Sequence, residues 1–234
     1  SFSRVYYSAE NIIQEDPVSL KLGNLTISAF PEQQGKLVAI NDGGRAGFRV
    51  CNSCGYATLD KKPGSHETPW GSKCKSEHFQ RRISLGHEFQ TDVLHIQING
   101  YQNKNQGFWY SLLYAILEGA STALEIERRD IDGCLYAYSG DPSSPRIVLF
   151  DDVPGGAGHV KRISESRENL LKVLTSAYSK MTNCTCGGAI GDSSCYSCLR
   201  NYGNQFCHDE LKRGKVVDFF KEYVLPYIID EVAI

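Results

Sequence analysis

The sequence lacks the features that mark membrane proteins, secreted proteins and ATP-driven motors. No apolar run reaches the roughly 18 residues that a membrane-spanning helix needs, so we expect a cytoplasmic protein without membrane contacts. The first residues contain neither a methionine nor a signal-peptide pattern, and we expect the chain to be part of a larger protein. The motif GxxxxGK[ST] is also absent, which excludes an ATP site of that type.

The sequence also lacks a large excess of positive or negative side chains. The formal net charge is −2, from 25 lysines and arginines and 27 aspartates and glutamates. A nearly neutral chain has no overall attraction to nucleic acid, so any DNA contact must come from a local basic patch. Repeats and low-complexity tracts are absent, and a hydrophobic fraction of 41% is ordinary for a folded globular protein.

Cysteine, by contrast, is present in an unusual number and order. Nine cysteines are an odd number, so they cannot all pair with one another. Apart from Cys134 they form an early group, Cys51, Cys54 and Cys74, and a late group, Cys184, Cys186, Cys195, Cys198 and Cys207. In a domain large enough to bury its own core, grouped CxxC pairs indicate metal binding before disulfides.

The late group has the spacing of a structural zinc site. Cys184 and Cys186 form one close pair, and Cys195 and Cys198 form a second pair after a loop rich in glycine, serine and aspartate. Two such pairs can supply the four thiolates of a tetrahedral zinc ion, whereas a disulfide within a CxC pair would be strained. Cys207 and His208 are not needed as ligands.

The early group predicts a second zinc site, for which more than one set of four ligands fits the sequence. Cys51, Cys54 and the glycine after them have the form of a zinc-ribbon knuckle. Cys74 and His66 are the candidates for the other two positions, and His78 and His87 remain alternatives for the fourth. A disulfide between Cys51 and Cys54, with Cys74 free, is the competing interpretation. Four filled positions leave no room for a catalytic water, so both sites are predicted to be structural.

An acidic pair before a glycine-rich turn is the other unusual feature. Asp151 and Asp152 end an apolar run and precede Pro-Gly-Gly-Ala-Gly. The two carboxylates could bind a catalytic metal together with Glu125 and His159, as in a nuclease. The interpretation that we favour is a tight structural turn whose aspartate caps backbone N–H groups, because no complete catalytic motif accompanies the pair.

Basic and aromatic side chains follow the late cysteine group. Arg200, Tyr202, Lys212 and Arg213 have the composition of a surface that binds single-stranded nucleic acid, since aromatic rings stack on bases and cations pair with phosphates. A solvated face of the protein is the alternative. Further lysines and arginines surround the early cysteine group.

Hydrophobic periodicity predicts an α+β (mixed α/β) fold, with a central mixed sheet, flanking helices and inserted zinc-binding loops. Turn residues at 31–35 and 41–44 predict hairpins between short strands. Further strands are expected over 90–98, 135–138 and 146–150, and helices over 106–126, 163–181 and 215–229. We expect N-terminal strands with the knuckle over 1–80 and a sheet and helix body with the four-cysteine site over 81–234, integrated as one domain.

Three segments, 85–96, 150–160 and 184–214, together resemble the zinc-binding domain of the MrfA helicase family. That domain occurs at the C-terminal end of superfamily 2 DNA helicases and in DrmB, a component of the DISARM anti-phage system. The resemblance covers about residues 40–215 and implies that Cys184, Cys186, Cys195 and Cys198 bind metal. It also implies DNA or a helicase subunit as partner, in DNA repair or antiviral defence. The helicase motor motifs are absent, so we expect no ATPase activity from this chain alone, although it would belong to an ATP-dependent DNA helicase.

Three functions remain open at this point. The first is a zinc-stabilised accessory domain that holds single-stranded or forked DNA or a partner subunit. The second is a metal-dependent nuclease that uses Asp151, Asp152 and Glu125. The third is a zinc module that binds only proteins.

Overall fold

The computed structural model describes residues 3–8, 16–44, 46–61, 64–138 and 140–228. It divides into two compact units. Unit 1 comprises Ser1–Tyr6 and Val38–Glu88, and unit 2 comprises Tyr7–Leu37 and Phe89–Ile234. The sequence-based boundary at residue 80 remains a prediction. Of the helices in the described ranges, none combines the length and apolar character needed to span a bilayer.

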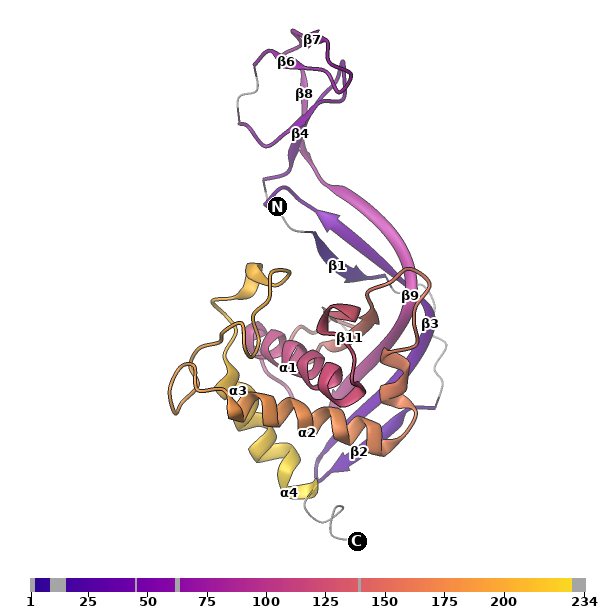
Figure 1. Cartoon of the computed structure of the whole chain (residues 1–234), viewed down its shortest axis with the longest axis vertical. Coiled ribbons are helices and arrows are strands. Elements are labelled where there is room, and N and C mark those ends of the chain that lie inside the picture. The colour runs from indigo at the N-terminus through magenta and orange to yellow at the C-terminus, as the bar shows by residue number, and fades with distance from the viewer. Residues whose placement is uncertain (1–2, 9–15, 45, 62–63, 139, 229–234) are drawn as a thin grey trace. The chain divides into compact units, whose positions relative to one another are not determined.

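The main sheet has the strand order β1-β3-β9-β11-β10, with β2 paired to β3 (Figure 1). Its antiparallel pairs include β9 with β11 and β11 with β10. The expected strand over 146–150 is β11, and all of its residues are buried. The strands are β1 (Arg4–Tyr7), β2 (Val18–Leu22), β3 (Leu25–Asn41), β9 (Leu85–Asn99), β10 (Ile131–Tyr136) and β11 (Arg146–Asp151).

Helices α1 (Gln106–Leu124) and α2 (Arg167–Asn183) confirm the first two helical predictions. Side-chain caps fix where they begin: Asn105 accepts a hydrogen bond from the backbone N–H of Gly107, and Ser166 accepts one from that of Asn169. Short 3-10 helices cover Arg128–Asp130, Val160–Ser164 and Gln205–Cys207.

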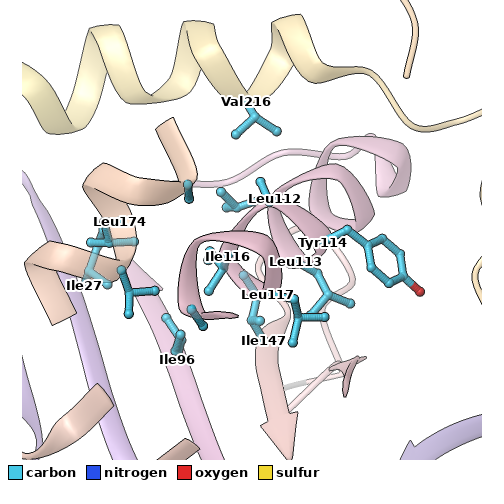
Figure 2. Packing of buried hydrophobic residues seen from close by; sticks show 14 of the residues in the cluster. Ile27, Ile96, Leu112, Leu113, Tyr114, Ile116, Leu117, Ile147, Leu174 and Val216 are labelled. Carbon is cyan, nitrogen blue, oxygen red and sulfur yellow. The ribbon is translucent and has the colours of Figure 1, made fainter. Parts of the chain in front are cut away.

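The core of unit 2 lies between these helices and one face of the sheet. Figure 2 shows Leu113, Leu117 and neighbouring residues of α1 beside Ile96 of β9 and Ile147 of β11. Leu174 of α2 and Val216 of the C-terminal helix belong to the same cluster. The helical spacing of the apolar residues in α1 therefore determines which of its faces is buried.

The C-terminal helix is interrupted rather than continuous. It consists of α3 (Arg213–Phe219), a π-helical segment over Phe220–Val224 and α4 (Leu225–Ile228). Pro226 has no N–H to donate to the preceding turn, which accounts for an irregularity next to it. The helix was expected over 215–229, with a bend at Pro226, and residue 229 lies outside the described residues.

Unit 1 contains short strands in two small sheets. One sheet has the order β5-β4-β8 and the other pairs β6 with β7. The strands are β4 (Phe48–Cys51), β5 (Ala57–Thr58), β6 (His66–Glu67), β7 (Lys73–Cys74) and β8 (Phe79–Ile83). The α+β fold class, with cysteine clusters in the loops, is confirmed.

Both expected hairpins are wrong. The turn at 41–44 lies between β3 and β4, but these strands are not paired, since β4 pairs with β5 and β8 in a separate sheet. Residues 31–35 were predicted to reverse the chain, but β3 continues through them from Leu25 to Asn41. Gln34 adopts a left-handed backbone with φ 56°. A single left-handed residue inside a strand bends it without reversing its direction, as in a bulge.

Candidate metal centres

The late cysteines form a compact cluster, here called the four-cysteine cluster: Cys184, Cys186, Cys195 and Cys198. Their sulfur atoms lie within 4.8 Å of one another. The Sγ–Sγ distances are 3.6 Å for Cys184–Cys195, 3.7 Å for Cys186–Cys198 and 3.8 Å for Cys195–Cys198. A tetrahedron with zinc–sulfur bonds of about 2.3 Å has edges of about 3.8 Å, whereas a disulfide needs about 2.05 Å. The cluster therefore has the dimensions of a zinc site.

Local backbone structure brings these four sulfur atoms together. Cys184 directly follows the last residue of α2 as its C-cap. Cys195 and Cys198 share a tight turn in which the N–H groups of Leu199 and Arg200 both donate to the carbonyl oxygen of Cys195. Between the pairs, Gly187 has a positive φ, and a Cβ there would lie 2.8 Å from the backbone nitrogen of Asp192. Glycine is thus required for the loop to fold back on itself.

Hydrogen bonds to sulfur favour the thiolate form at one corner of this cluster. Burial raises the pKa of Cys195, but the backbone N–H of Ser197 and the neighbouring thiols lower it to about 7. Burial raises the pKa of Cys198. A positive ion among these sulfurs would stabilise all of them as thiolates, which are the metal-binding form.

Arg213 lies behind the four-cysteine cluster, not on an open surface. Its side chain is buried, with the residue only 7% exposed. Its guanidinium donates to the carbonyl oxygens of Cys186 at 2.7 Å, Gly188 at 2.6 Å and Met181 at 3.4 Å. This arrangement suits a residue that holds the metal loop against the start of α3, and it does not suit the nucleic-acid contact expected from the sequence.

The other three residues of the expected nucleic-acid surface are placed differently. Arg200 donates to Ser194 Oγ at 2.9 Å and to the carbonyl oxygen of His208 at 3.3 Å. Lys212 pairs with Asp192 at 2.5 Å. Tyr202 is 74% exposed, so its ring is the most accessible of the set, and a DNA contact at this surface stays a prediction.

The early cysteines form a second cluster with one histidine, here called the Cys3His cluster: Cys51, Cys54, His66 and Cys74. Their ligand atoms also lie within 4.8 Å of one another. The Sγ atoms of Cys51 and Cys74 are 3.9 Å apart, and Cys54 Sγ lies 3.2 Å from Nε2 of His66. Gly55, with φ 75°, turns the knuckle and donates its N–H to the carbonyl oxygen of Cys51. Three sulfurs and one nitrogen are an ordinary ligand set for structural zinc.

The orientation of His66 favours it for the fourth position. Its Nδ1 lies 3.0 Å from the carbonyl oxygen of Gly64, which requires that nitrogen to carry the proton and leaves the Nε2 lone pair facing the cysteines. The ring also stacks on Tyr56, with centroids 4.6 Å apart. His78 and His87, the alternatives, are not part of the cluster.

The knuckle also directs N–H groups at sulfur. Burial raises the pKa of the Cys51 thiol, but the backbone N–H groups of Ser53 and Cys54 outweigh burial and lower the pKa to about 6. The cysteines of both clusters, all within the described residues, are free of disulfides. The chain therefore has two clusters, each of which can hold a zinc ion.

Asp151 caps the glycine-rich turn. One carboxylate oxygen, Oδ2, accepts hydrogen bonds from the N–H groups of Ala157 and His159, and Oδ1 accepts one from Val160. Asp151 is fully buried, whereas Asp152 and Glu125 are exposed. Among the described residues these carboxylates are not grouped with other metal-binding side chains, and the hydrogen bonds of Asp151 match the structural turn.

A buried polar network on the sheet was missed by sequence reasoning. Glu32 Oε2 accepts a hydrogen bond from Tyr7 at 2.7 Å and lies 2.7 Å from Nε2 of His95. Arg146 lies over the rings of Phe30 and Tyr138. Strand alternation correctly places Leu94 and Ile96 toward the helices, but it does not reveal that the opposite face is buried as well. These residues come from separate strands, so no spacing in the sequence links them.

Comparison with known proteins locates the four-cysteine cluster within a described domain. Residues 112–199 match the family model described as the MrfA Zn-binding domain. The matched segment runs from α1 to just past Cys198 and contains all four cysteines, while the Cys3His cluster lies outside it. The resemblance inferred from the sequence is thereby confirmed over these residues.

A curated relative and two solved structures are also similar. Druantia protein DruE from Escherichia coli (strain UMEA 4076-1) is 28% identical over 211 residues, covering 76% of this chain and 11% of that protein. The DNA-bound crystal structure of the DUF1998 helicase MrfA has a TM-score of 0.48 at 13% identity, covering 94% of this chain and 24% of that one. Its complex with DNA and AMPPNP has a TM-score of 0.39 at 9% identity, covering 95% and 23%. The chain spans about a tenth of the curated relative and about a quarter of each solved chain. Residues 112–199 of this chain are therefore similar to the MrfA Zn-binding domain.

Proposed function

We propose that this chain is the zinc-stabilised accessory domain of a DNA helicase, or of a cytoplasmic defence or repair complex that works beside one. The single observation that carries the proposal is the match of residues 112–199 to the MrfA Zn-binding domain together with four sulfurs at tetrahedral spacing inside that segment. In this role the chain contributes contacts to single-stranded or forked DNA or to a partner subunit, and it leaves ATP hydrolysis to other parts of the assembly.

The proposal includes two structural zinc ions. The ligands are Cys184, Cys186, Cys195 and Cys198 for one ion, and Cys51, Cys54, His66 and Cys74 for the other. Sulfur ligands suit a closed structural site, because four filled positions leave no place for a catalytic water. Thiolate ligands also suit the reducing environment of the cytoplasm.

Elemental analysis of the purified chain tests the two ligand sets. We expect two zinc ions per chain, about one in the Cys195→Ser variant and about one in the His66→Ala variant. His78→Ala is the matched control and should keep both ions, since that histidine lies outside the cluster. A metal-free, disulfide-bonded chain would refute both sites.

DNA binding is tested by fluorescence anisotropy with labelled single-stranded and forked oligonucleotides at low and moderate salt. We expect affinity that falls as salt rises, because phosphate contacts release counterions, and no ATP hydrolysis by this chain. A zinc-loaded chain without DNA affinity at low salt would instead support a protein-binding module. A protein-binding module is the second candidate function, because Ile190, in the loop of the four-cysteine cluster, exposes its apolar side chain.

A further inference from the structure

The charge of the chain is divided unequally between its two units. By sequence, unit 1 contains nine lysines and arginines and five aspartates and glutamates, a net charge of +4. The remaining residues contain sixteen lysines and arginines and twenty-two aspartates and glutamates, a net charge of −6. A zinc ion with three thiolates in the Cys3His cluster lowers the charge of unit 1 by only one. Attraction to a polyanion therefore resides in unit 1, although the whole chain is slightly acidic.

Unit 1 also exposes a tryptophan at the tip of a short hairpin. Strands β6 and β7 are joined by a tight turn, here called the Trp70 hairpin tip, over residues 68–72 (Figure 1). Thr68 receives a hydrogen bond from Gly71 N–H on its carbonyl oxygen and one from Ser72 N–H on its hydroxyl. Trp70 is 68% exposed on this turn. The turn is therefore well ordered by hydrogen bonds while its largest side chain remains in solvent.

The base of the same hairpin is formed by two of the proposed zinc ligands. His66 and Cys74 lie directly opposite each other in the β6–β7 register. A metal ion bound there holds the two strands together four residues on either side of Trp70. An aromatic ring presented on a clamped hairpin loses little conformational entropy on binding, which strengthens its contribution to affinity.

Cations accompany this ring. Lys73 and Lys75 flank the ligand Cys74, and both are exposed. Lys61, Arg81 and Arg82 are exposed elsewhere in unit 1. A stacking ring next to solvent-exposed cations is the combination used for single-stranded nucleic acid, because unpaired bases offer flat faces and the backbone offers phosphates.

We propose that the Trp70 hairpin tip is a contact for single-stranded DNA. Trp70 stacks on an unpaired base, while Lys73 and Lys75 interact with the adjacent phosphates. The inference rests on the proposed function and deepens it, since it assigns the strand contact to unit 1 and not to the residues around the four-cysteine cluster.

Intrinsic fluorescence gives a direct test, because the chain contains two tryptophans and only one of them is accessible. Trp109 is fully buried in α1, and its indole N–H donates to the carbonyl oxygen of Asn103. Titration of the zinc-loaded full chain with an unlabelled oligothymidylate should therefore quench Trp70 selectively. The Trp70→Phe variant should lose the quenching signal but still bind a labelled oligonucleotide.

Affinity measurements supply the second readout. Base stacking contributes roughly 1–3 kcal/mol, so Trp70→Ala should weaken binding by about 5- to 150-fold. Lys73→Ala combined with Lys75→Ala should reduce the slope of log affinity against log salt by about 0.7 for each lost phosphate contact. Leu59→Ala, which removes another exposed apolar side chain of unit 1, is the control and should bind like the unsubstituted chain.

The outcomes separate this inference from the proposed function. The inference would be overturned if the chain binds DNA without tryptophan quenching, if Trp70→Ala leaves the affinity unchanged, and if Tyr202→Ala or Arg200→Ala lowers it. That result would leave the accessory DNA-binding role intact. Absence of any DNA affinity at low salt in a chain that contains two zinc ions would overturn both. Quenching with a loss of affinity confined to the Trp70 and lysine variants would support both.

Discussion

Arg213 holds the metal loop through hydrogen bonds from a buried cation to three backbone carbonyl oxygens. Replacing Arg213 with Ala leaves these oxygens buried without donors, so we expect the free energy of unfolding to fall by about 3 kcal/mol. Zinc should also pass to a chromogenic chelator faster, because Cys186 and Gly188 lose their support. Thermal denaturation and stopped-flow zinc release measure the two effects.

Lys212, the preceding residue, provides the matched control. Its ion pair with Asp192 is partly exposed, and such pairs contribute about 0–1 kcal/mol. Lys212→Ala should therefore change neither the melting temperature nor the zinc release rate by much. Equal effects of the two substitutions would show that Arg213 acts by general charge and not through its hydrogen bonds.

His95 predicts a dependence of stability on pH. Burial lowers the pKa of His95 below its usual 6.5, although its hydrogen bond with Glu32 opposes this. Burial raises the pKa of Glu32, but hydrogen bonds from His95 and Tyr7 bring it below its usual 4.5. When folding lowers the pKa of a group, the unfolded chain binds more protons than the folded chain as the pH falls through that range. The free energy of unfolding should then decrease below pH 6.5 for His95 and below pH 4.5 for Glu32.

Urea denaturation at pH 7.5, 6.5 and 5.5, in the unsubstituted chain and in His95→Gln, measures the contribution of His95. One proton gives a slope of at most about 1.4 kcal/mol per pH unit. The variant should be less stable at pH 7.5 but should lose less stability on acidification, because the glutamine does not titrate. Parallel pH profiles for the two proteins would contradict the prediction, since the zinc ligands titrate equally in both.

The contact between α1 and α2 depends on a glycine. A Cβ at Gly119 would lie 2.4 Å from the carbonyl oxygen of Val173 and 2.6 Å from the backbone nitrogen of Ala177. In an exposed helix, Gly→Ala stabilises by about 1 kcal/mol. Here the added methyl group would force two helices apart, so we expect Gly119→Ala to destabilise by about 1–3 kcal/mol. Chemical denaturation measures whether the free energy of unfolding rises or falls. A fall shows that the steric overlap between α1 and α2 outweighs the higher helix propensity of alanine.

Thr122 lies on the exposed side of the same helix and serves as control. Thr122→Ala should be neutral or slightly stabilising, because alanine has the higher helix propensity. If both substitutions stabilise the chain, the two helices are not packed as closely at Gly119 as the structure has them.

Elements with local signals could be predicted from the sequence. The helical spacing of Trp109, Leu112 and Ile116 was sufficient to predict α1. The CxC and CxxC spacings were sufficient to predict that Cys184, Cys186, Cys195 and Cys198 lie together. The prediction of a hairpin at 31–35 was wrong because Pro31 and Gly35 are residue types that often form turns. Pairing of β3 with distant strands of the main sheet keeps the chain extended there. The contacts of Glu32 with Tyr7 and His95 span 25 and 63 residues, and only the assembled sheet creates them.

At the scale of the whole molecule, the two units differ in what holds them together. In unit 2, a large apolar cluster connects the sheet with α1, α2 and α3. Among the described residues of unit 1, the buried hydrophobic side chains are Cys51, Cys54 and Cys74, with Tyr56 and Phe79 packed on them. A unit whose core consists of metal ligands cannot offset its conformational entropy without the metal.

Zinc removal should therefore affect the two units unequally. After treatment with a strong chelator, we expect hydrogen exchange to become fast throughout 48–83, from β4 to β8, and in the loop from Cys184 to Cys198, while amides of α1, β9 and β11 remain protected. Structural zinc contributes about 10–16 kcal/mol in small zinc-dependent units, far more than the few apolar contacts of unit 1 can replace. Added zinc should restore protection and magnesium should not, since thiolates prefer the softer ion. Loss of protection in α1 together with unit 1, or retained protection of 48–83 in the metal-free chain, would show that the apolar core and the metal sites are not independent sources of stability.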